Sequence, residues 1–228
     1  MNTSPATMLV MESRTILMQR MLDYVRSGYD RFTGGSIATE KLSRFVRKMD
    51  LTYQVCIDKH QRVRRKRAGL GNAVLLMYRS AETDEVMWWL LVTGGTHPAH
   101  TGEKLQDVAA MKVFGHQMTH ETRKGKSKPA MTWRMTAETY QNWRDNIMAC
   151  VRSRSVPQMV SVLAALYKLP GFSGIRTRIG RLAVLYRAEV RRHGLENVAP
   201  PTPKRLGYVR RVKTTGVTVS QLARQRTR

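Results

Sequence analysis

Acidic residues are scarce in this chain. It has 16 Asp and Glu residues against 40 Lys and Arg residues, which gives a formal net charge of +24 and a pI near 11.0. Unmatched positive charges repel one another in a folded protein, so an excess of this size indicates an anionic partner. A strongly basic domain is typical of nucleic-acid-binding proteins, and we expect nucleic-acid contact, with DNA favoured over RNA.

Cysteine is rare, and long apolar runs are missing. Cys56 and Cys150 are too few for a disulfide framework or a four-cysteine zinc site, so we expect two reduced core thiols in a cytosolic protein. The longest purely apolar run, Val86–Val92, has seven residues, whereas a membrane-spanning helix needs about 20. The uncharged start, Met1–Ala6, and the charge of Glu12 do not resemble a secretory signal. The sequence therefore predicts no membrane partner and a cytoplasmic location, associated with the nucleoid or a plasmid.

Hydrophobic residues make up 42% of the chain, which is enough to form a core. Thr7–Arg26 has the pattern of a helix with a wide apolar face, which should be buried against the domain or against a second copy in a homo-oligomer. Gly34-Gly35 predicts a chain break, and Glu40–Asp50 has the spacing of a second amphipathic helix. Tyr53–Arg67 is ambiguous and ends in a dense basic run.

The middle of the chain favours strands. Asn72–Arg79 and Glu85–Thr93 are rich in β-forming residues and predict a hairpin. Glu103–Met111 predicts a short helix, and Lys112–Thr122 with Ala130–Met135 predicts a second hairpin around a basic loop. Together these segments indicate a small, mostly antiparallel sheet.

From Thr136 onward the pattern is helical. Helices are expected after Thr136, over Val156–Leu169 and over Gly174–Arg192, whose arginines lie opposite an apolar stripe. The composition then becomes proline-rich and basic without periodicity. We therefore expect an α+β protein, with a sheet packed by N- and C-terminal helices in a single domain over residues 1–196. Residues 197–228 are expected to form a basic tail that is disordered when free.

The positive charge gathers in clusters. One lies in Lys59–Arg67 and another in Arg123–Lys128, while the segment from Ser173 to the end has 14 cations and two acids, half of the net charge. A single basic run is usually a solvated face, but several together favour phosphate contact, whose affinity falls steeply with salt. The predicted nucleic-acid-binding residues are Lys59, Arg62, Arg64, Arg65, Lys66, Arg67, Arg123, Lys124, Lys126, Lys128, Arg178, Arg181, Arg187, Arg191, Arg192, Lys204, Arg205, Arg210 and Arg211.

The histidines do not have a specific metal-binding pattern. His97 and His100 could supply two zinc ligands, whereas His116 and His120 on one strand would lie about 13 Å apart. A closed zinc site needs four ligands, usually with Cys, and neither cysteine lies in a paired motif. We predict no metal and no cofactor, and the combination of the four histidines in one site stays open.

Catalytic motifs are incomplete. Strand-breaking nucleases of plasmid replication combine a His-apolar-His strand with a helical tyrosine; Tyr140 fits the second element, but the triplet is missing. His120-Glu121-Thr122-Arg123 matches a His-x-x-Arg element of tyrosine recombinases, yet Tyr140 follows too closely. These patterns predict no catalytic residue.

Several short motifs occur together along the chain. They are Arg64-Arg65-Lys66-Arg67-x-Gly69, Trp88-Trp89-Leu90-Leu91-Val92-Thr93, His97-Pro98-Ala99-His100, Thr132-Trp133-Arg134-Met135-Thr136 and Pro170-Gly171-Phe172-Ser173-Gly174-Ile175-Arg176. As a set, up to about Arg192, they resemble uncharacterised basic proteins carried on bacterial plasmids and integrative elements. The resemblance implies a setting in the maintenance, replication or transfer of mobile DNA, and it implies no activity.

These observations favour a non-enzymatic DNA-binding accessory protein of a mobile element. Two alternatives belong to other classes. One is a structural RNA-binding protein of a ribonucleoprotein particle, whose basic tail threads between RNA helices. The other is a relaxase-like or nuclease-like enzyme with a site that the motifs do not reveal.

Overall fold

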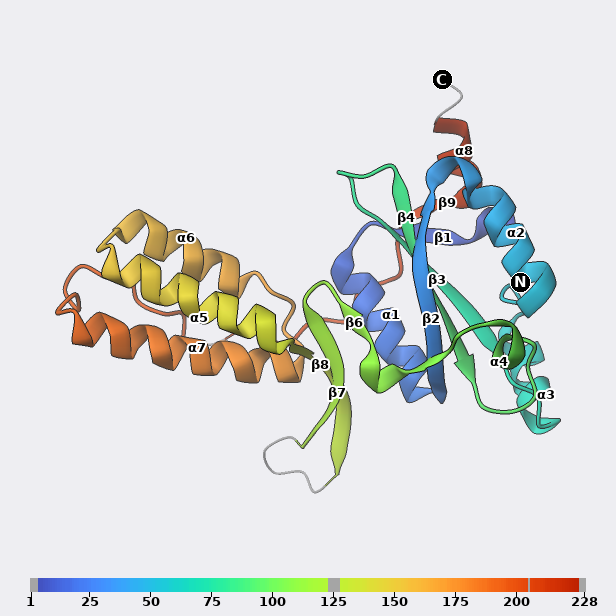
Figure 1. Ribbon diagram of the computed structural model, residues 1–228, viewed down its shortest axis with the longest axis horizontal. Helices are drawn as coiled ribbons and strands as arrows, with labels where there is room; N and C mark the ends of the chain where they lie inside the picture. Colours follow the sequence, from blue (N-terminus) through green and yellow to red (C-terminus); the bar gives the residue numbers. More distant parts are fainter. Residues whose placement is uncertain (1–3, 123–127, 205, 226–228) are drawn as a thin grey trace. The chain divides into compact units, whose positions relative to one another are not determined.

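The computed structural model of the chain describes residues 4–122, 128–204 and 206–225 (Figure 1). The predicted α+β class is confirmed, because helices accompany a mostly antiparallel six-stranded sheet and lie near both ends of the chain. The domain boundaries differ from the prediction of one domain over residues 1–196. One compact unit runs up to Met111 and also includes the residues from Arg211 onward, and the other is Lys112–Arg210.

The first unit is built around the six-stranded sheet, in the order β5-β2-β4-β3-β1-β9. The strands are β1 (Leu9–Met11), β2 (Tyr29–Ala38), β3 (Ala73–Arg79), β4 (Glu85–Thr93), β5 (Gln106–Asp107) and β9 (Val217–Thr218). β1 runs parallel to β3, and the other neighbouring strands are antiparallel. β3 is a continuous apolar run because both of its faces are buried.

Helices cover both faces of this sheet. Leu75 and Met77 of β3 join a core cluster with α2 (Leu42–Tyr53) and α8 (Val219–Gln225). The alternate residues point to the opposite face, where Arg14 at the start of α1 (Arg14–Arg26) donates to the Tyr78 hydroxyl at 3.3 Å. The apolar side chains of α1 are buried by the sheet of the same chain, so the burial that suggested a second copy is provided internally.

The predicted break at Gly34-Gly35 is wrong, because both glycines lie inside the long strand β2. Gly34 pairs with Trp89 and Gly35 with Trp88 in the register of β2 with β4. A Cβ at Gly34 would lie 2.8 Å from the Trp88 carbonyl oxygen, and one at Gly35 would lie 3.3 Å from the Trp88 ring. The glycines are therefore there to admit the tryptophans and do not interrupt the strand.

The second unit combines a small sheet with three long helices. Its elements are β6 (Lys112–Val113), β7 (His116–Thr122), β8 (Pro129–Met135), α5 (Ala137–Arg152), α6 (Val156–Tyr167) and α7 (Ser173–Arg192). The sheet order is β6-β7-β8, and Trp133 of β8 is fully buried. α7 packs closely on this sheet, since a Cβ at Gly174 would lie 2.6 Å from the Trp133 carbonyl oxygen. The predicted second hairpin is therefore confirmed as the centre of this unit.

The proline-rich segment after Leu195 is not a free tail. Four hydrogen bonds tie it to α6 and α7 along Pro200–Lys204 and Leu206–Val209, which we call the strap. They join Tyr186 Oη to the Pro200 carbonyl at 2.9 Å, Arg187 Nη1 to Thr202 Oγ1 at 2.9 Å, Tyr167 Oη to the Pro203 carbonyl at 3.2 Å, and Arg176 Nε to the Leu206 carbonyl at 2.9 Å. Side-chain hydrogen bonds of this kind produce no periodicity, which is why the pattern suggested disorder.

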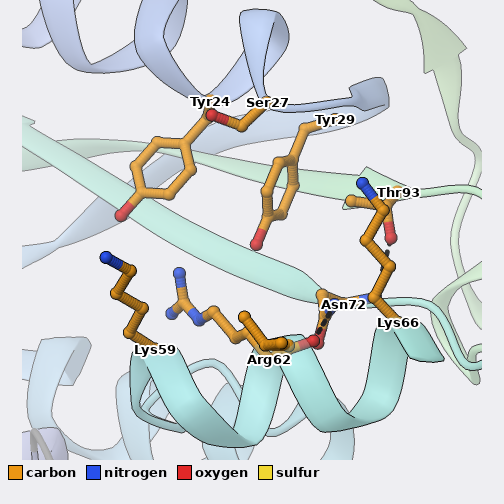
Figure 2. A pocket seen from close by; sticks show the side chains of 9 residues that line it. Tyr24, Ser27, Tyr29, Lys59, Arg62, Lys66, Asn72 and Thr93 are labelled. Atoms are coloured by element: carbon orange, nitrogen blue, oxygen red, sulfur yellow. Dashed lines mark hydrogen bonds between the residues drawn. The ribbon is translucent and has the colours of Figure 1, made fainter. Parts of the chain in front are cut away.

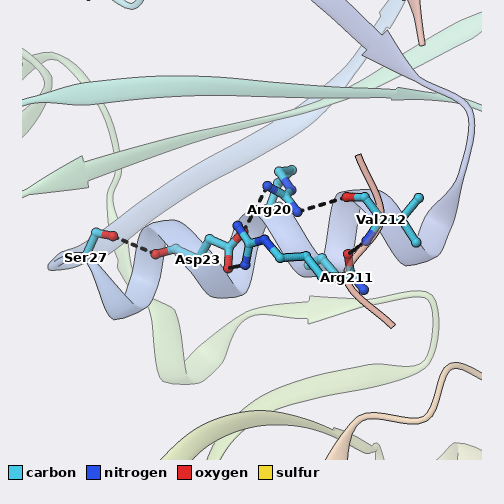
Figure 3. A network of polar contacts seen from close by, with 6 residues as sticks. Arg20, Asp23, Ser27, Arg211 and Val212 are labelled. Carbon is cyan, nitrogen blue, oxygen red and sulfur yellow. Dashed lines mark hydrogen bonds and ion pairs between the residues drawn. The ribbon is translucent and has the colours of Figure 1, made fainter. Parts of the chain in front are cut away.

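The chain then returns to the first unit (Figure 3). Arg211 donates to both carboxylate oxygens of Asp23 at 3.0 Å, and the Val212 amide donates to Gln19 Oε1 at 3.1 Å. β9 follows, and α8 buries Val219 and Leu222 to 2% exposure each in the core of that unit. The expectation of a disordered segment over residues 197–228 is therefore wrong for the described residues up to 225.

Candidate nucleic-acid interface

The first basic cluster forms helix α3 (Lys59–Arg67). Asp58 caps it by accepting the Gln61 amide at 2.8 Å, and Gln61 Oε1 accepts the Asp58 amide at 3.0 Å. Ala68 is the C-terminal cap of the helix, and the next residue, Gly69, has a φ of +73° that suits the end of a helix. Its last turn is entirely basic, and positive charge is favourable beside the negative end of the helix dipole. The local sequence thus stabilises a short helix that carries an unusual density of cations.

The cations of α3 point in different directions. Arg65 turns back onto the protein, donating to the Gly71 carbonyl at 3.1 and 2.9 Å and to Gln54 Oε1 at 2.8 Å. This predicted contact residue is therefore part of the scaffold. Arg64 and Arg67 are exposed on the outer side of the helix. The remaining three cations of the cluster, Lys59, Arg62 and Lys66, line a pocket.

We call this hollow the α3 pocket (Figure 2). It has a volume of about 390 Å³ and lies between the end of α1, the start of β2, the end of β4 and α3. Its lining residues are Tyr24, Ser27, Tyr29, Lys59, Arg62, Val63, Lys66, Asn72 and Thr93. None of these nine residues is acidic. The pocket therefore presents positive charge, aromatic rings and hydroxyl groups together.

Arg62 occupies the middle of the pocket. Its Nη2 donates to the Val55 carbonyl at 3.1 Å, and its guanidinium lies 5.9 Å from the centre of the Tyr24 ring. Burial raises the pKa of Tyr29, and the positive charge of Arg62 opposes that rise. The two tyrosine rings meet edge to face at 5.2 Å, with their hydroxyls directed toward α3 in Figure 2. The cation is thus held in place beside an aromatic wall.

Asn72 forms the floor of the pocket and is 4% exposed. Its amide nitrogen Nδ2 donates to the Arg62 carbonyl at 3.1 Å, and its backbone amide donates to Thr93 Oγ1 at 2.9 Å. The first of these contacts holds the side-chain amide of Asn72 against α3. Within the described part of the chain, neither Asn72 Oδ1 nor the buried Nε of Arg62 has a hydrogen-bond partner.

The arginines of α7 are mostly engaged within the second unit. The guanidinium of Arg178 lies 4.5 Å from the centre of the Tyr140 ring, and Arg187 holds the strap through Thr202. Arg192 pairs with the buried carboxylate of Glu189. Arg181 and Arg191 are exposed. α7 therefore offers fewer available cations than the sequence predicts.

The strap adds a smaller basic hollow of about 260 Å³ in the second unit, lined by residues that include Arg176, Arg187 and Lys204. The Arg176 guanidinium also stacks on Tyr208, 3.6 Å from the ring centre. Arg176 is absent from the predicted contact residues, although it lies on the polar side of the same helix.

The remaining predicted residues have mixed outcomes. Lys128 and Arg210 are exposed, and Arg211 is bound to Asp23. Arg123, Lys124, Lys126 and Arg205 lie outside the described residues. The structure therefore gathers three of the six cations of α3 at one pocket in the first unit, whereas most of the predicted residues outside α3 belong to the second.

The four histidines divide between the two units. His97 and His100 lie in the first, with ring centres 6.5 Å apart, and His116 and His120 lie on β7 of the second. Over residues 4–122, 128–204 and 206–225, no group of three or more His, Cys, Asp or Glu side chains is placed to hold a metal ion.

Two of these histidines make stability depend on pH. Burial lowers the pKa of His97 and of His116 from the ordinary value of 6.5. A neutral His97 is needed because its Nδ1 accepts the Ala99 amide at 3.2 Å. Below pH 6.5 the unfolded chain binds protons that the folded chain excludes, so the free energy of unfolding should fall as the pH is lowered from 6.5.

Urea unfolding between pH 5 and pH 8 measures this effect. His97→Asn should keep an acceptor for the Ala99 amide and flatten the part of the pH dependence that comes from His97. The part of the pH dependence that comes from His116 should remain in this variant. A wild-type free energy of unfolding that stays level below pH 6.5 would contradict the assignment of both buried histidines as neutral.

The sequence revealed the basic run Lys59–Arg67 but neither the helix that it forms nor the pocket beside it. Tyr24, Tyr29, Asn72 and Thr93 come from separate segments, and none belongs to a basic run. One signal was available: Tyr24 and Tyr29 flank a turn at Gly28, which has a φ of +98° and therefore suits glycine. That signal indicates a turn with aromatic residues on both sides, but it does not indicate that α3 faces them.

Comparisons with protein-family models, curated proteins and solved structures find no match to this chain. Among the described residues, no helix has both the length and the apolar character needed to cross a bilayer.

Proposed function

We propose that the chain is a non-enzymatic DNA-binding accessory protein of a bacterial mobile element, acting in the cytoplasm on plasmid or nucleoid DNA. The observation that carries the proposal is the placement of Lys59, Arg62 and Lys66 around one pocket without an acidic lining residue. Phosphates are the natural partners of such a group, since each contact releases counterions from the nucleic acid. The setting in a mobile element rests on the resemblance of the local motifs.

Contacts within the protein favour DNA binding over the model of a threading RNA-binding tail. The strap is held by Tyr186, Arg187 and Arg176, and the following residues return to Asp23 of the first unit. A segment fixed in this way is not free to follow RNA helices. The exposed cations on α3 instead form a short rigid surface, which suits contact with a phosphate backbone.

A filter-binding competition distinguishes DNA from structured RNA. Labelled duplex DNA bound to the full chain should be displaced by unlabelled duplex DNA at least as effectively as by a folded RNA of equal phosphate concentration. A folded RNA that competes about tenfold better, a difference of about 1.4 kcal/mol, would contradict the DNA assignment. Supercoiled plasmid incubated with the protein and Mg²⁺ should stay supercoiled, and nicking would contradict the non-enzymatic assignment.

A further inference from the structure

The α3 pocket contains two buried polar groups of opposite kind that the protein leaves unused. Arg62 Nε is a hydrogen-bond donor and Asn72 Oδ1 is an acceptor, and neither has a partner among the described residues. A buried polar group without a partner costs about 1–3 kcal/mol. Buried polar groups in proteins are nearly always paired, so this donor and acceptor in one pocket call for a ligand that satisfies both.

The pair restricts the chemistry of that ligand. Arg62, with Lys59 and Lys66 at the rim, requires an anionic acceptor such as a phosphate. Asn72 Oδ1 requires an N–H or O–H donor, which the phosphodiester group of a nucleic-acid strand does not have. A nucleotide carries both kinds of group, because its phosphate accepts hydrogen bonds and its base or sugar donates them. The combination therefore selects a nucleotide over a fully deprotonated oxyanion.

The dimensions favour a single, unpaired nucleotide. The volume of about 390 Å³ lies at the low end of the range of about 300–1,000 Å³ that is usual for small-ligand pockets. A base pair would also have its Watson–Crick donors occupied by the opposite strand, whereas an unpaired base has them free for Asn72. The Tyr24 and Tyr29 rings on the wall can contact the face of a base, as aromatic residues do in single-strand-binding proteins.

We propose that the α3 pocket binds one unpaired nucleotide of a nucleic-acid strand. Its phosphate lies against Arg62 and the rim lysines, Lys59 and Lys66, and a base or sugar donor lies on Asn72 Oδ1. This inference rests on the proposed function, since it specifies what the basic surface of α3 recognises. It adds a preference that charge alone does not produce: strands with unpaired residues should bind more tightly than blunt duplex of equal charge.

Calorimetric titration of the full chain tests the ligand class directly. The probes are the four deoxynucleoside 5′-monophosphates and sulfate, an oxyanion without an O–H group, at the same pH and ionic strength. At least one mononucleotide should bind about tenfold more tightly than sulfate, because it satisfies Asn72 as well as Arg62. Equal affinities for the mononucleotides and sulfate would overturn the inference and reduce the pocket to an anion site.

Matched variants of α3 locate the binding. Lys59→Ser with Lys66→Ser removes the two rim cations, and Arg64→Ser with Arg67→Ser removes two cations from the outer side of the same helix. All four are exposed, so both double variants should fold. The rim variant should lose about tenfold in mononucleotide affinity and the outer variant less than about twofold. Equal losses in the two variants would overturn the inference.

A third variant addresses the pocket floor. Asn72→Leu removes the acceptor with little change in volume and should abolish the preference for mononucleotides over sulfate. The preference surviving in a folded Asn72→Leu protein would overturn the assigned role of Oδ1. Because Asn72 also donates to the Arg62 carbonyl, the Asn72→Leu protein is first compared with wild type by thermal unfolding. If the Asn72→Leu protein does not fold, the result from the rim variant decides.

Binding to DNA tests the pocket inference and the proposed DNA-binding function separately. Duplexes with an unpaired overhang should bind more tightly than blunt duplexes that carry the same number of phosphates. If blunt and overhanging duplexes bind equally and with a steep salt dependence, the pocket inference fails while the proposed DNA-binding function stands. If neither DNA binds at low salt, the proposed function fails as well.

Discussion

Truncation after Arg210 is expected to lower the free energy of unfolding of the first unit by about 3–6 kcal/mol, from the loss of two fully buried apolar side chains alone. Those side chains are Val219 and Leu222 of α8, each 2% exposed in the cluster that α2 and the sheet form. The truncation also removes β9, which pairs with β1, and the contact of Arg211 with Asp23. Without β9, β1 would become an edge strand whose backbone groups on that side have no hydrogen-bond partner.

Urea unfolding followed by tryptophan fluorescence measures the loss, with Trp88 and Trp89 reporting on the first unit. Leu222→Ala keeps every charge and should by itself cost about 2–5 kcal/mol. A second truncation, after Gln225, should leave the stability of the first unit unchanged because it retains α8. An unchanged unfolding midpoint after removal of residues 211–228 would mean that the C-terminal segment is not part of this core.

The second large effect is expected on DNA affinity. Replacing Lys59, Arg64, Lys66 and Arg67 with Ser removes four exposed cations of α3 and leaves the scaffold contacts of Arg65 in place. Each lost phosphate contact should reduce the slope of log affinity against log salt by about one. Affinity for duplex DNA at low salt should fall by about 100-fold or more if most of the four contact phosphates.

The chain offers a matched control in the same unit. Lys41, Arg44, Arg47 and Lys48 are four exposed cations on and just before α2. Replacing them with Ser changes the net charge by the same amount without altering α3. Titrations by fluorescence anisotropy should show a slope close to wild type for this variant. Equal losses for the two variants would mean that total charge, and not the surface of α3, determines binding.

Local patterns predicted the parts of the fold that depend on neighbouring residues. Glu85–Thr93 was predicted with its observed bounds, because a run of β-branched and aromatic residues between turns needs no long-range information. The helix over Gly174–Arg192 was predicted within one residue for a similar reason, since its apolar stripe recurs at helical spacing. The predicted break at Gly34-Gly35 is wrong because the role of these glycines depends on Trp88 and Trp89, which are distant in sequence.

The candidate site was predicted only in part. The cation density of α3 is visible in the sequence, but the use of Arg65 as a scaffold residue depends on the carbonyl of Gly71. The pocket depends on a turn at Gly28 and on Asn72 reaching back to α3. The C-terminal segment was misjudged because hydrogen bonds to proline carbonyls and an ion pair with Asp23 hold it, and such contacts have no periodic signature.

The central claim is that the basic surface of the first unit binds nucleic acid through phosphates. The most direct test is a titration of the full chain with duplex DNA across a series of salt concentrations. With roughly six or more phosphates contacted, affinity should fall by about 10³-fold or more between about 50 and 200 mM salt, along a straight line of log affinity against log salt. A flat salt response, or no binding at about 50 mM salt, would contradict the account.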